Sequence, residues 1–205
     1  MFSGKCGRSN DEEDTLKEVS RTVYFATENK AKYHEAARIA SNFGIKLKHL
    51  EVVKQEIQAD NLTQIASFAA EQAAKARRVP VVSEDAGFFV EALSGFPGPY
   101  SSYVYRTLGI LGILKLLKNV KMRKATFLAA VAYCQPDRTP VCFAGSVRGV
   151  VSTKRRGSHG FGFDPIFIPI NGDGRTFAQM DITEKNRYSH RARAFVKFYR
   201  WFASR

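Results

Sequence analysis

Cysteine is scarce in this sequence: there are three in 205 residues, and none of them forms a C-x-x-C pair. Such a count does not suit a disulfide framework or a zinc site. No apolar run approaches the roughly 18 residues of a membrane span, and the first residues lack the basic-then-apolar pattern of a secretory signal. Neither a Walker A loop nor a dinucleotide-binding glycine fingerprint is present. We therefore expect a cytoplasmic protein without a membrane span.

Acidic residues are also few, 19 against 32 Lys and Arg, which gives a net charge of +13. Residues 1–20 are polar with a net charge of −2, so residues 21–205 carry +15. This balance favours a polyanionic partner, a nucleotide or a nucleic acid, although positive charge can also serve solubility alone. We expect residues 1–20 to be a peripheral extension and residues 21–205 to form a single two-lobed domain.

Two adjacent carboxylates, Glu84 and Asp85, follow the apolar strand predicted at residues 80–82. Neighbouring side chains of a strand point to opposite faces, so the two cannot both be buried. We expect one of them to project at the carboxyl edge of the strand, where ligands bind in α/β sheets. There it would serve either a metal or catalytic site, or a cap of the following turn.

A predicted strand at residues 21–26 leads through Thr27 and Asn29 into a helix that ends near Gly44. The N-terminus of such a helix offers free N–H groups to an anion, and Lys32 adds a positive charge one turn later. A simple N-cap beside a solvated lysine explains the same pattern.

Two more cations fall on predicted helices. Lys75 lies in the last turn of an Ala-rich helix at about residues 61–78, where it would complement the helix dipole. Arg106 lies in the first turn of a helix predicted at residues 103–118, where a cation opposes the dipole and so indicates an anionic ligand.

The second half of the chain contains a predicted antiparallel hairpin, residues 124–135 and 140–152, followed by a basic loop. The next turn places Phe161 and Phe163 one glycine apart, so that they either stack on a planar ring or join the core. Ser189 is a natural N-cap for a terminal helix that we expect to end near residue 202.

His190 and Arg191 fill the first turn of that terminal helix, where its dipole disfavours cations. With Lys185 nearby, this favours a ligand, although a lone His is more often a packed or surface residue. Taken together, the dispersed lysines, the carboxylates and the aromatic pair match the needs of a nucleoside triphosphate: neutralised phosphates, bound Mg²⁺ and a stacking surface for the base.

Five motifs, in order over residues 22–203, resemble the inosine triphosphate pyrophosphatase family. They are Thr27-x-Asn29-x-x-Lys32, Ser83-Glu84-Asp85-Ala86-Gly87, the loop from Gly95 to Ser102, the turn from Gly160 to Phe167, and Lys185-Asn186-x-x-Ser189-His190-Arg191. One such motif is weak, but five in order are highly specific.

The resemblance implies an α/β fold, elongated, with a long mixed sheet, flanking helices and two lobes around a central active-site cleft. It implies Mg²⁺-dependent hydrolysis of non-canonical purine triphosphates (ITP, dITP and XTP) to the monophosphate and pyrophosphate, which removes deaminated purines from the nucleotide pool. It also implies a homodimer, with no specific nucleic-acid partner expected.

The resemblance also assigns roles to residues that match the family motifs. Asp85 would bind Mg²⁺ and help activate water, with Glu56 as a second metal-side carboxylate. The triphosphate would contact Thr27, Asn29, Lys32 and Lys75. The base pocket would be lined by Phe161, Gly162, Phe163 and Asp164, while Lys185, His190 and Arg191 would contact the base and neighbouring phosphates.

The sequence departs from the family pattern at three positions. Ala86, expected to line the substrate site beside the metal aspartate, stands where Ser or Thr is usual. Gln179 stands where Glu is usual, and Tyr188 replaces an aliphatic residue. None of these changes removes an essential charge, so we expect activity to be retained.

Two other functions fit part of the pattern. A basic nucleic-acid-binding module would use the +15 of residues 21–205 and the loop Lys154-Arg155-Arg156, but the sequence contains no recognised binding module. A related pyrophosphatase acting on modified pyrimidine nucleotides is the other alternative, and the His190–Arg191 pair argues against it.

Overall fold

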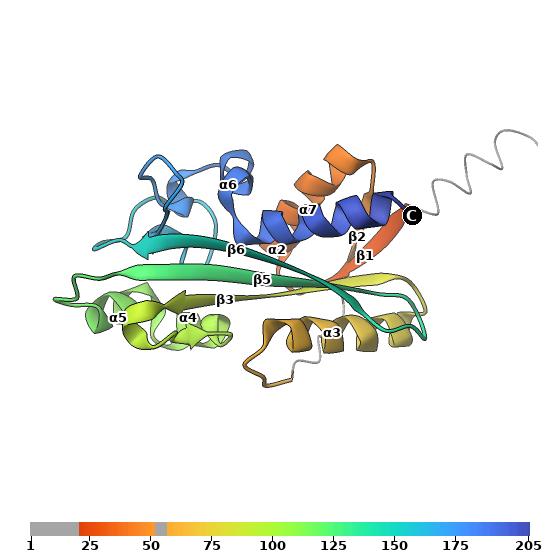
Figure 1. Cartoon of the computed structure of the whole chain (residues 1–205), viewed down its shortest axis with the longest axis horizontal. Helices are drawn as coiled ribbons and strands as arrows, with labels where there is room; N and C mark the ends of the chain where they lie inside the picture. Colours follow the sequence, from red (N-terminus) through yellow and green to blue (C-terminus); the bar gives the residue numbers. More distant parts are fainter. Residues whose placement is uncertain (1–20, 52–56) are drawn as a thin grey trace, which may run out of the picture.

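The computed structural model describes residues 21–51 and 57–205. These residues form one mixed sheet with helices on both of its faces, elongated along three long strands (Figure 1). The strands are β1 (Thr22–Ala26), β2 (Lys46–Leu50), β3 (Val81–Val90), β4 (Pro97–Gly98), β5 (Lys124–Cys134), β6 (Val141–Val151) and β7 (Phe167–Pro169). The helices are α2 (Lys30–Ala40), α3 (Leu62–Arg77), α4 (Ser101–Thr107), α5 (Gly109–Leu116), α6 (Ile182–Tyr188) and α7 (His190–Ala203). The predicted fold class is confirmed.

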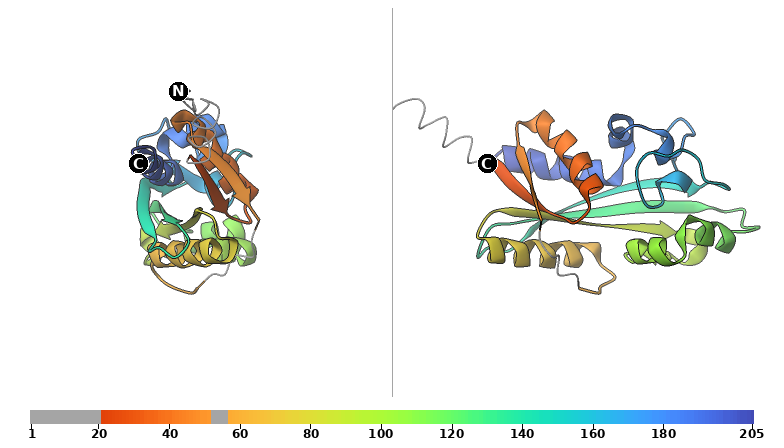
Figure 2. Two further views of the ribbon diagram at one scale, coloured as in Figure 1. Left: turned by 90° about the vertical axis from the view of Figure 1, so that its right-hand side faces the viewer. Right: turned by 180° about the vertical axis from the view of Figure 1, so that it is seen from behind.

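The sheet has the strand order β2-β1-β3-β5-β6-β7, and β4 pairs separately with β3. Strand β1 runs parallel to β2 and β3, whereas β3, β5, β6 and β7 follow one another antiparallel. Helices α2 and α7 cover one face, and α3, α4 and α5 cover the other (Figures 1 and 2). Among the described residues, no helix has the length and apolar composition of a membrane span.

The hydrophobic core is divided between the two ends of the sheet. One end is built around Phe88, Ile113 and Phe167, and the other around Phe25 and Phe195, with the Ala-rich face of α3 packed on the opposite side of the sheet. Strands β3 and β5 contribute to both ends. The middle of β3 therefore lies between two packed regions.

Several local predictions hold. Asn61 caps α3 by accepting a hydrogen bond from the backbone N–H of Thr63, and Ser189 caps α7 by accepting one from Ala192. The side chains of Asn61 and Ser189 thus satisfy N–H groups that a helix start leaves unpaired. The predicted hairpin at residues 124–135 and 140–152 is the β5–β6 pair.

The helix predicted at residues 103–118 is instead two helices, α4 and α5, which meet at Leu108 and Gly109. Gly109 has a φ of 62°, a left-handed conformation that a continuous right-handed helix excludes. The leucine spacing is periodic across this break, so periodicity alone did not reveal it.

The position of Glu84 and Asp85 also differs from the prediction. Strand β3 continues to Val90, so both residues lie in the middle of the strand rather than at its carboxyl edge. They pair with Val131 and Ala130 of β5 in an uninterrupted ladder. The alternation prediction holds, because Glu84 is 2% exposed while Asp85 is half-buried.

Helix α6 was not predicted. Its signal was present, because Asp181 and Glu184 form a capping box in which each side chain accepts a hydrogen bond from the backbone N–H of the other. Gln179 has a similar role in the preceding turn, where its Oε1 accepts hydrogen bonds from the backbone N–H and the hydroxyl of Thr176. The departure at Gln179 is therefore compatible with the local fold.

Candidate active site

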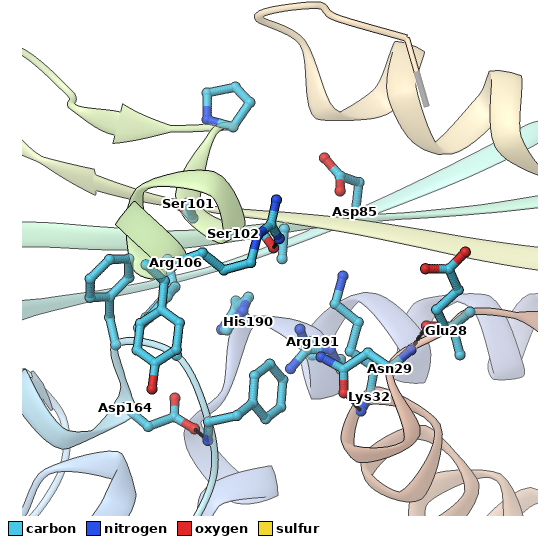
Figure 3. Close-up of a pocket in the computed structure, with 18 residues that line it drawn as sticks. Glu28, Asn29, Lys32, Asp85, Ser101, Ser102, Arg106, Asp164, His190 and Arg191 are labelled. Carbon is cyan, nitrogen blue, oxygen red and sulfur yellow. Dashed lines mark hydrogen bonds between the residues drawn. The ribbon is translucent and has the colours of Figure 1, made fainter. Parts of the chain in front are cut away.

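A cavity of about 720 Å³ lies between the two packed ends of the molecule (Figure 3). This volume is within the range of about 300–1,000 Å³ that is typical of ligand sites. The cavity is lined by Thr27, Glu28, Asn29, Lys32, Asp85, Ala86, Pro99, Ser101, Ser102, Tyr105, Arg106, Phe127, Phe161, Gly162, Phe163, Asp164, His190 and Arg191. Six segments that are separate in sequence thus converge on one space.

A gap in strand pairing gives this cavity access to β3. On one edge of β3, pairing with β1 ends at Ser83 and pairing with β4 begins at Phe88. Between them, residues 84–87 have no strand partner on that edge within the described part of the chain. Asp85 and Ala86 line the cavity at this gap, so the interrupted edge takes the place of the strand end that we predicted.

The turn before α2 is held by its own side chains. Asn29 Oδ1 accepts hydrogen bonds from the N–H groups of Ala31 (2.9 Å) and Lys32 (3.3 Å), and Thr27 Oγ1 accepts one from the N–H of Asn29. The expectation that these helix N–H groups are free for an anion is therefore wrong for Ala31 and Lys32. His49 Nε2 lies 2.7 Å from the carbonyl oxygen of Thr27, and it must be the donor because a carbonyl only accepts.

In and behind the cavity wall, six charged residues form a continuous network, in which all but the partly exposed Lys32 are buried. Glu84 pairs with Lys32 (2.8 Å) and with Nε of Arg191 (3.1 Å). Glu35 links Nη1 of Arg191 (2.6 Å) to Lys185 (2.7 Å), which also pairs with Asp164 (2.6 Å). Three cations and three carboxylates thus balance, which is how charges are tolerated away from water.

The network sets the ionisation of its members. Burial opposes the charge of Glu35, but Arg191 and Lys185 outweigh it and hold the pKa of Glu35 below its ordinary value. Burial raises the pKa of Asp164, against the attraction of Lys185. The pKa of Lys185 is raised despite its burial because Asp164 and Glu35 stabilise the ammonium. Lys185 therefore stays charged at neutral pH.

Of the two predicted aromatic residues, Phe161 is the one that presents a ring to the site. Its ring lies against the cations of Lys185 (4.9 Å to the centroid) and Arg191 (5.2 Å). Phe163 is 3% exposed and stacks on Phe88 in the core. The prediction of a core residue therefore fits Phe163, and the prediction of an exposed stacking ring fits Phe161. Asp164 fixes the turn by accepting a hydrogen bond from the N–H of Phe161 (2.8 Å).

His190 and Arg191 reach the cavity from the first turn of α7. The imidazole of His190 stacks on the ring of Phe127, with centroids 4.6 Å apart, and its buried Nδ1 has no hydrogen-bond partner among the described residues. Arg191 uses Nε and Nη1 in the network, and its Nη2 donates to no residue within 21–51 and 57–205. Both side chains therefore retain hydrogen-bonding capacity at the cavity.

We expect His190 to make stability depend on pH. Burial and the nearby cations Arg191 and Lys185 lower the pKa of His190 well below its ordinary 6.5, so it is neutral when folded. Below pH 6.5 the unfolded chain binds one more proton, and the free energy of unfolding should fall by up to about 1.4 kcal/mol per pH unit. Urea unfolding at pH 7, 6 and 5 measures this slope. His190→Gln should reduce it and His159→Gln, on the exposed loop, should not; equal slopes in the two variants would refute the assignment.

Two predicted site residues, Lys75 and Lys185, are placed differently from the rest, and a third cannot be compared with them. Lys75 is exposed in the last turn of α3 and does not line the cavity. Lys185 lies behind Phe161 and holds Glu35 and Asp164, so its predicted contact with the base is not supported by this geometry. Glu56 lies outside the described residues. Thr27, Asn29, Lys32, Asp85, Ala86, Phe161, Gly162, Phe163, Asp164, His190 and Arg191 are all brought to the cavity.

Sequence reasoning missed several residues of this site. Glu35 was hidden because a lone carboxylate on a predicted helix face carries no local signal. Glu28 and Tyr105 line the cavity without a pattern of their own, and Ser102 lies in the Gly95–Ser102 motif but was given no role in the site. Arg106 was noticed in the sequence but was not assigned to the site.

The family model of the Ham1 family matches residues 23–201. This chain belongs to the Ham1 family. A Methanopyrus kandleri protein named dITP/XTP pyrophosphatase is 47% identical over 180 residues, which cover 88% of this chain and 95% of that protein. A protein of the same name from Saccharolobus solfataricus is 50% identical over 172 residues, which cover 84% of this chain and 88% of the relative. The family relationship predicted from five motifs is thereby confirmed.

Solved Ham1 structures share the fold. The Ham1 protein of Coxiella burnetii is 27% identical with a TM-score of 0.78, and the match covers 90% of this chain and 99% of that chain. The Staphylococcus aureus Ham1 protein is 26% identical with a TM-score of 0.76, and the match covers 89% of this chain and 98% of that chain. The long mixed sheet is thus common to this chain and other Ham1 proteins.

Among the described residues, no group of three or more His, Cys, Asp or Glu side chains forms a ready-made metal cage. Three carboxylates nevertheless line the cavity: Asp164, which is paired with Lys185, and also Glu28 and Asp85. Mg²⁺ is usually held by only one or two carboxylates, together with water and substrate phosphates. The donor set of this Ham1 protein therefore fits Mg²⁺ bound with a phosphorylated substrate.

Proposed function

We propose that this Ham1 protein hydrolyses the non-canonical purine nucleotides ITP, dITP and XTP to the nucleoside monophosphate and pyrophosphate. The observation that carries the proposal is one cavity that combines Asp85 at a gap in the sheet, Lys32 at a helix start, and Phe161 beside Arg191. Relatives named dITP/XTP pyrophosphatase, up to 50% identical, support the same activity.

The base would stack on Phe161, with Arg191 Nη2 and the imidazole of His190 as hydrogen-bonding groups at its edge. A 6-oxo purine such as hypoxanthine or xanthine accepts the hydrogen bond of Arg191. Adenine presents a 6-amino donor instead and would leave the guanidinium donor unpaired, which is a strongly discriminating mismatch. The network behind the wall holds Arg191 through Glu35 and Glu84, so this donor is fixed before the base arrives.

Hydrolysis would proceed by attack of water on the α-phosphorus. The new bond joins the water oxygen to phosphorus, the bond between the α-phosphorus and the bridging oxygen breaks, and pyrophosphate leaves with its electron pair. In this proposal Asp85 would orient the water and accept its proton. Lys32, whose charge is paired with Glu84, would donate hydrogen bonds to the phosphates from the start of α2.

We propose that Mg²⁺ is the cofactor, held by Asp85 with Glu28 or Glu56 as a further carboxylate. When bound, it supplies charge neutralisation for the triphosphate. Chelation by EDTA should therefore abolish turnover, and added Mg²⁺ should restore it. Full activity in metal-free buffer would exclude this cofactor.

We propose that the enzyme removes deaminated purine triphosphates from the nucleotide pool. We propose a cytoplasmic homodimer in which residues 21–205 form a single two-lobed domain, with residues 1–20 as a peripheral extension. The division of the core between the two ends of the sheet supports the two lobes.

Product identity tests the proposed reaction. Phosphorus NMR of dITP with enzyme and Mg²⁺ should show dIMP and pyrophosphate in equal amounts. Release of single phosphate, or no release from ITP, dITP or XTP between neutral and alkaline pH, would contradict the proposal. Preferential cleavage of a modified pyrimidine triphosphate would favour the alternative substrate class, and tight, steeply salt-dependent binding of duplex DNA would favour the nucleic-acid alternative.

A further inference from the structure

Three cations line the cavity: Lys32, Arg106 and Arg191. Two of them are already neutralised from behind the wall, because Lys32 pairs with Glu84 and Arg191 pairs with both Glu84 and Glu35. Their charges belong to the balanced network of three cations and three carboxylates. They position hydrogen bonds well, but they add little net positive charge to the cavity.

Arg106 is different. It is an exposed residue of α4, on the wall opposite Lys32 and Arg191 (Figure 3), and it makes no ion pair with any residue in 21–51 or 57–205. Its Nη1 donates a hydrogen bond to Ser102 Oγ at 2.7 Å, which aims the guanidinium and leaves its other N–H groups available. Ser102 itself lines the cavity.

Arg106 lies in a different part of its helix from the one predicted. The sequence predicts the first turn, but α4 ends at Thr107, so Arg106 lies in the last turn, where a cation is favoured. The helix dipole therefore does not indicate a ligand, whereas the position of Arg106 in the cavity lining does. Besides the members of the network, the described residues that line the cavity include two carboxylates, Glu28 and Asp85, and one cation, Arg106.

We infer that Arg106 binds the phosphate chain of the substrate from the α4 wall. The charges of Lys32 and Arg191 are already paired with carboxylates, whereas Arg106 has its full charge available for the anionic phosphate chain, and a guanidinium matches phosphate oxygens with paired N–H donors. This inference rests on the proposed function and names a residue that holds the substrate for that reaction.

Two variants and a matched control test the inference. Arg106→Gln should lower kcat/KM for dITP by about 10- to 100-fold, the range for losing a hydrogen bond to a charged group, and Arg106→Lys should recover part of the loss. Lys115→Gln removes the same charge from the exposed face of α5, outside the cavity, and should change kcat/KM by less than about twofold. Equal losses in Arg106→Gln and Lys115→Gln would overturn the inference.

Binding measurements separate phosphate contact from other roles. With Mg²⁺ present, calorimetry should show that Arg106→Gln weakens binding of inorganic tripolyphosphate about 10-fold or more and leaves binding of inosine, which has no phosphate, unchanged. Unchanged tripolyphosphate affinity, or a selective loss of inosine affinity, would overturn the inference. If the wild-type protein releases no pyrophosphate but binds tripolyphosphate through Arg106, the proposed reaction fails while this anion site stands.

Discussion

Replacement of Asp85 by Asn should reduce kcat for dITP by about 10³-fold or more while the protein still binds the substrate. Asp85 is the cavity carboxylate at the gap in the sheet, and the amide keeps its size but loses the charge that holds Mg²⁺ and accepts a proton from water. Steady-state kinetics gives the loss in turnover, and calorimetry with dITP gives the binding constant.

A neighbouring carboxylate provides the matched control. Glu91 is exposed just beyond the end of β3 and does not line the cavity, so Glu91→Gln should keep kcat near the wild-type value. A value of kcat within about tenfold of wild type in Asp85→Asn would remove Asp85 from the mechanism.

Replacement of Lys185 by Met should destabilise the protein by about 3–5 kcal/mol, the usual cost of removing one partner from a buried ion pair. Lys185 is 2% exposed and lies between Glu35 and Asp164, so its loss leaves carboxylates buried with fewer cations. For a protein of this size, the melting temperature should fall by roughly 10 °C. Urea unfolding and calorimetry measure the two quantities.

An exposed pair gives the comparison for this loss. Arg78 and Asp137 are 2.7 Å apart, but their side chains are 67% and 65% exposed. Asp137→Asn should therefore change stability by less than about 1 kcal/mol. If Lys185→Met were as stable as Asp137→Asn, the buried network would not contribute to folding as argued.

The motif residues of the site could be predicted from sequence, and the residues that support them could not. Asp85, Phe161 and Arg191 were found because each lies in a recognisable local pattern. Glu35 lies on an ordinary helix face, and its value appears only when the fold brings Lys185 and Arg191 to it from more than 100 positions away. Pairing of that kind is a property of the tertiary structure.

In the fold, too, the features set by local sequence could be predicted. The caps at Asn61 and Ser189 fix the starts of two helices through residues next to them in the chain, so both starts were predicted from the sequence. The break at Gly109 was not predicted, because Leu108 and Leu111 keep helical spacing across it and the left-handed backbone angle of Gly109 is not displayed by the sequence. The access of Asp85 to the cavity depends on where β1 stops and β4 begins, which is a matter of strand pairing between distant segments.

In the proposed reaction a fixed donor, Arg191, selects 6-oxo purines in the cavity where the triphosphate is cleaved. The most direct test is the ratio of kcat/KM for dITP to that for dATP, measured by pyrophosphate release with Mg²⁺. A ratio of about 10² or more, falling towards one in Arg191→Met, is the predicted result. Equal cleavage of dITP and dATP by the wild-type protein would contradict it.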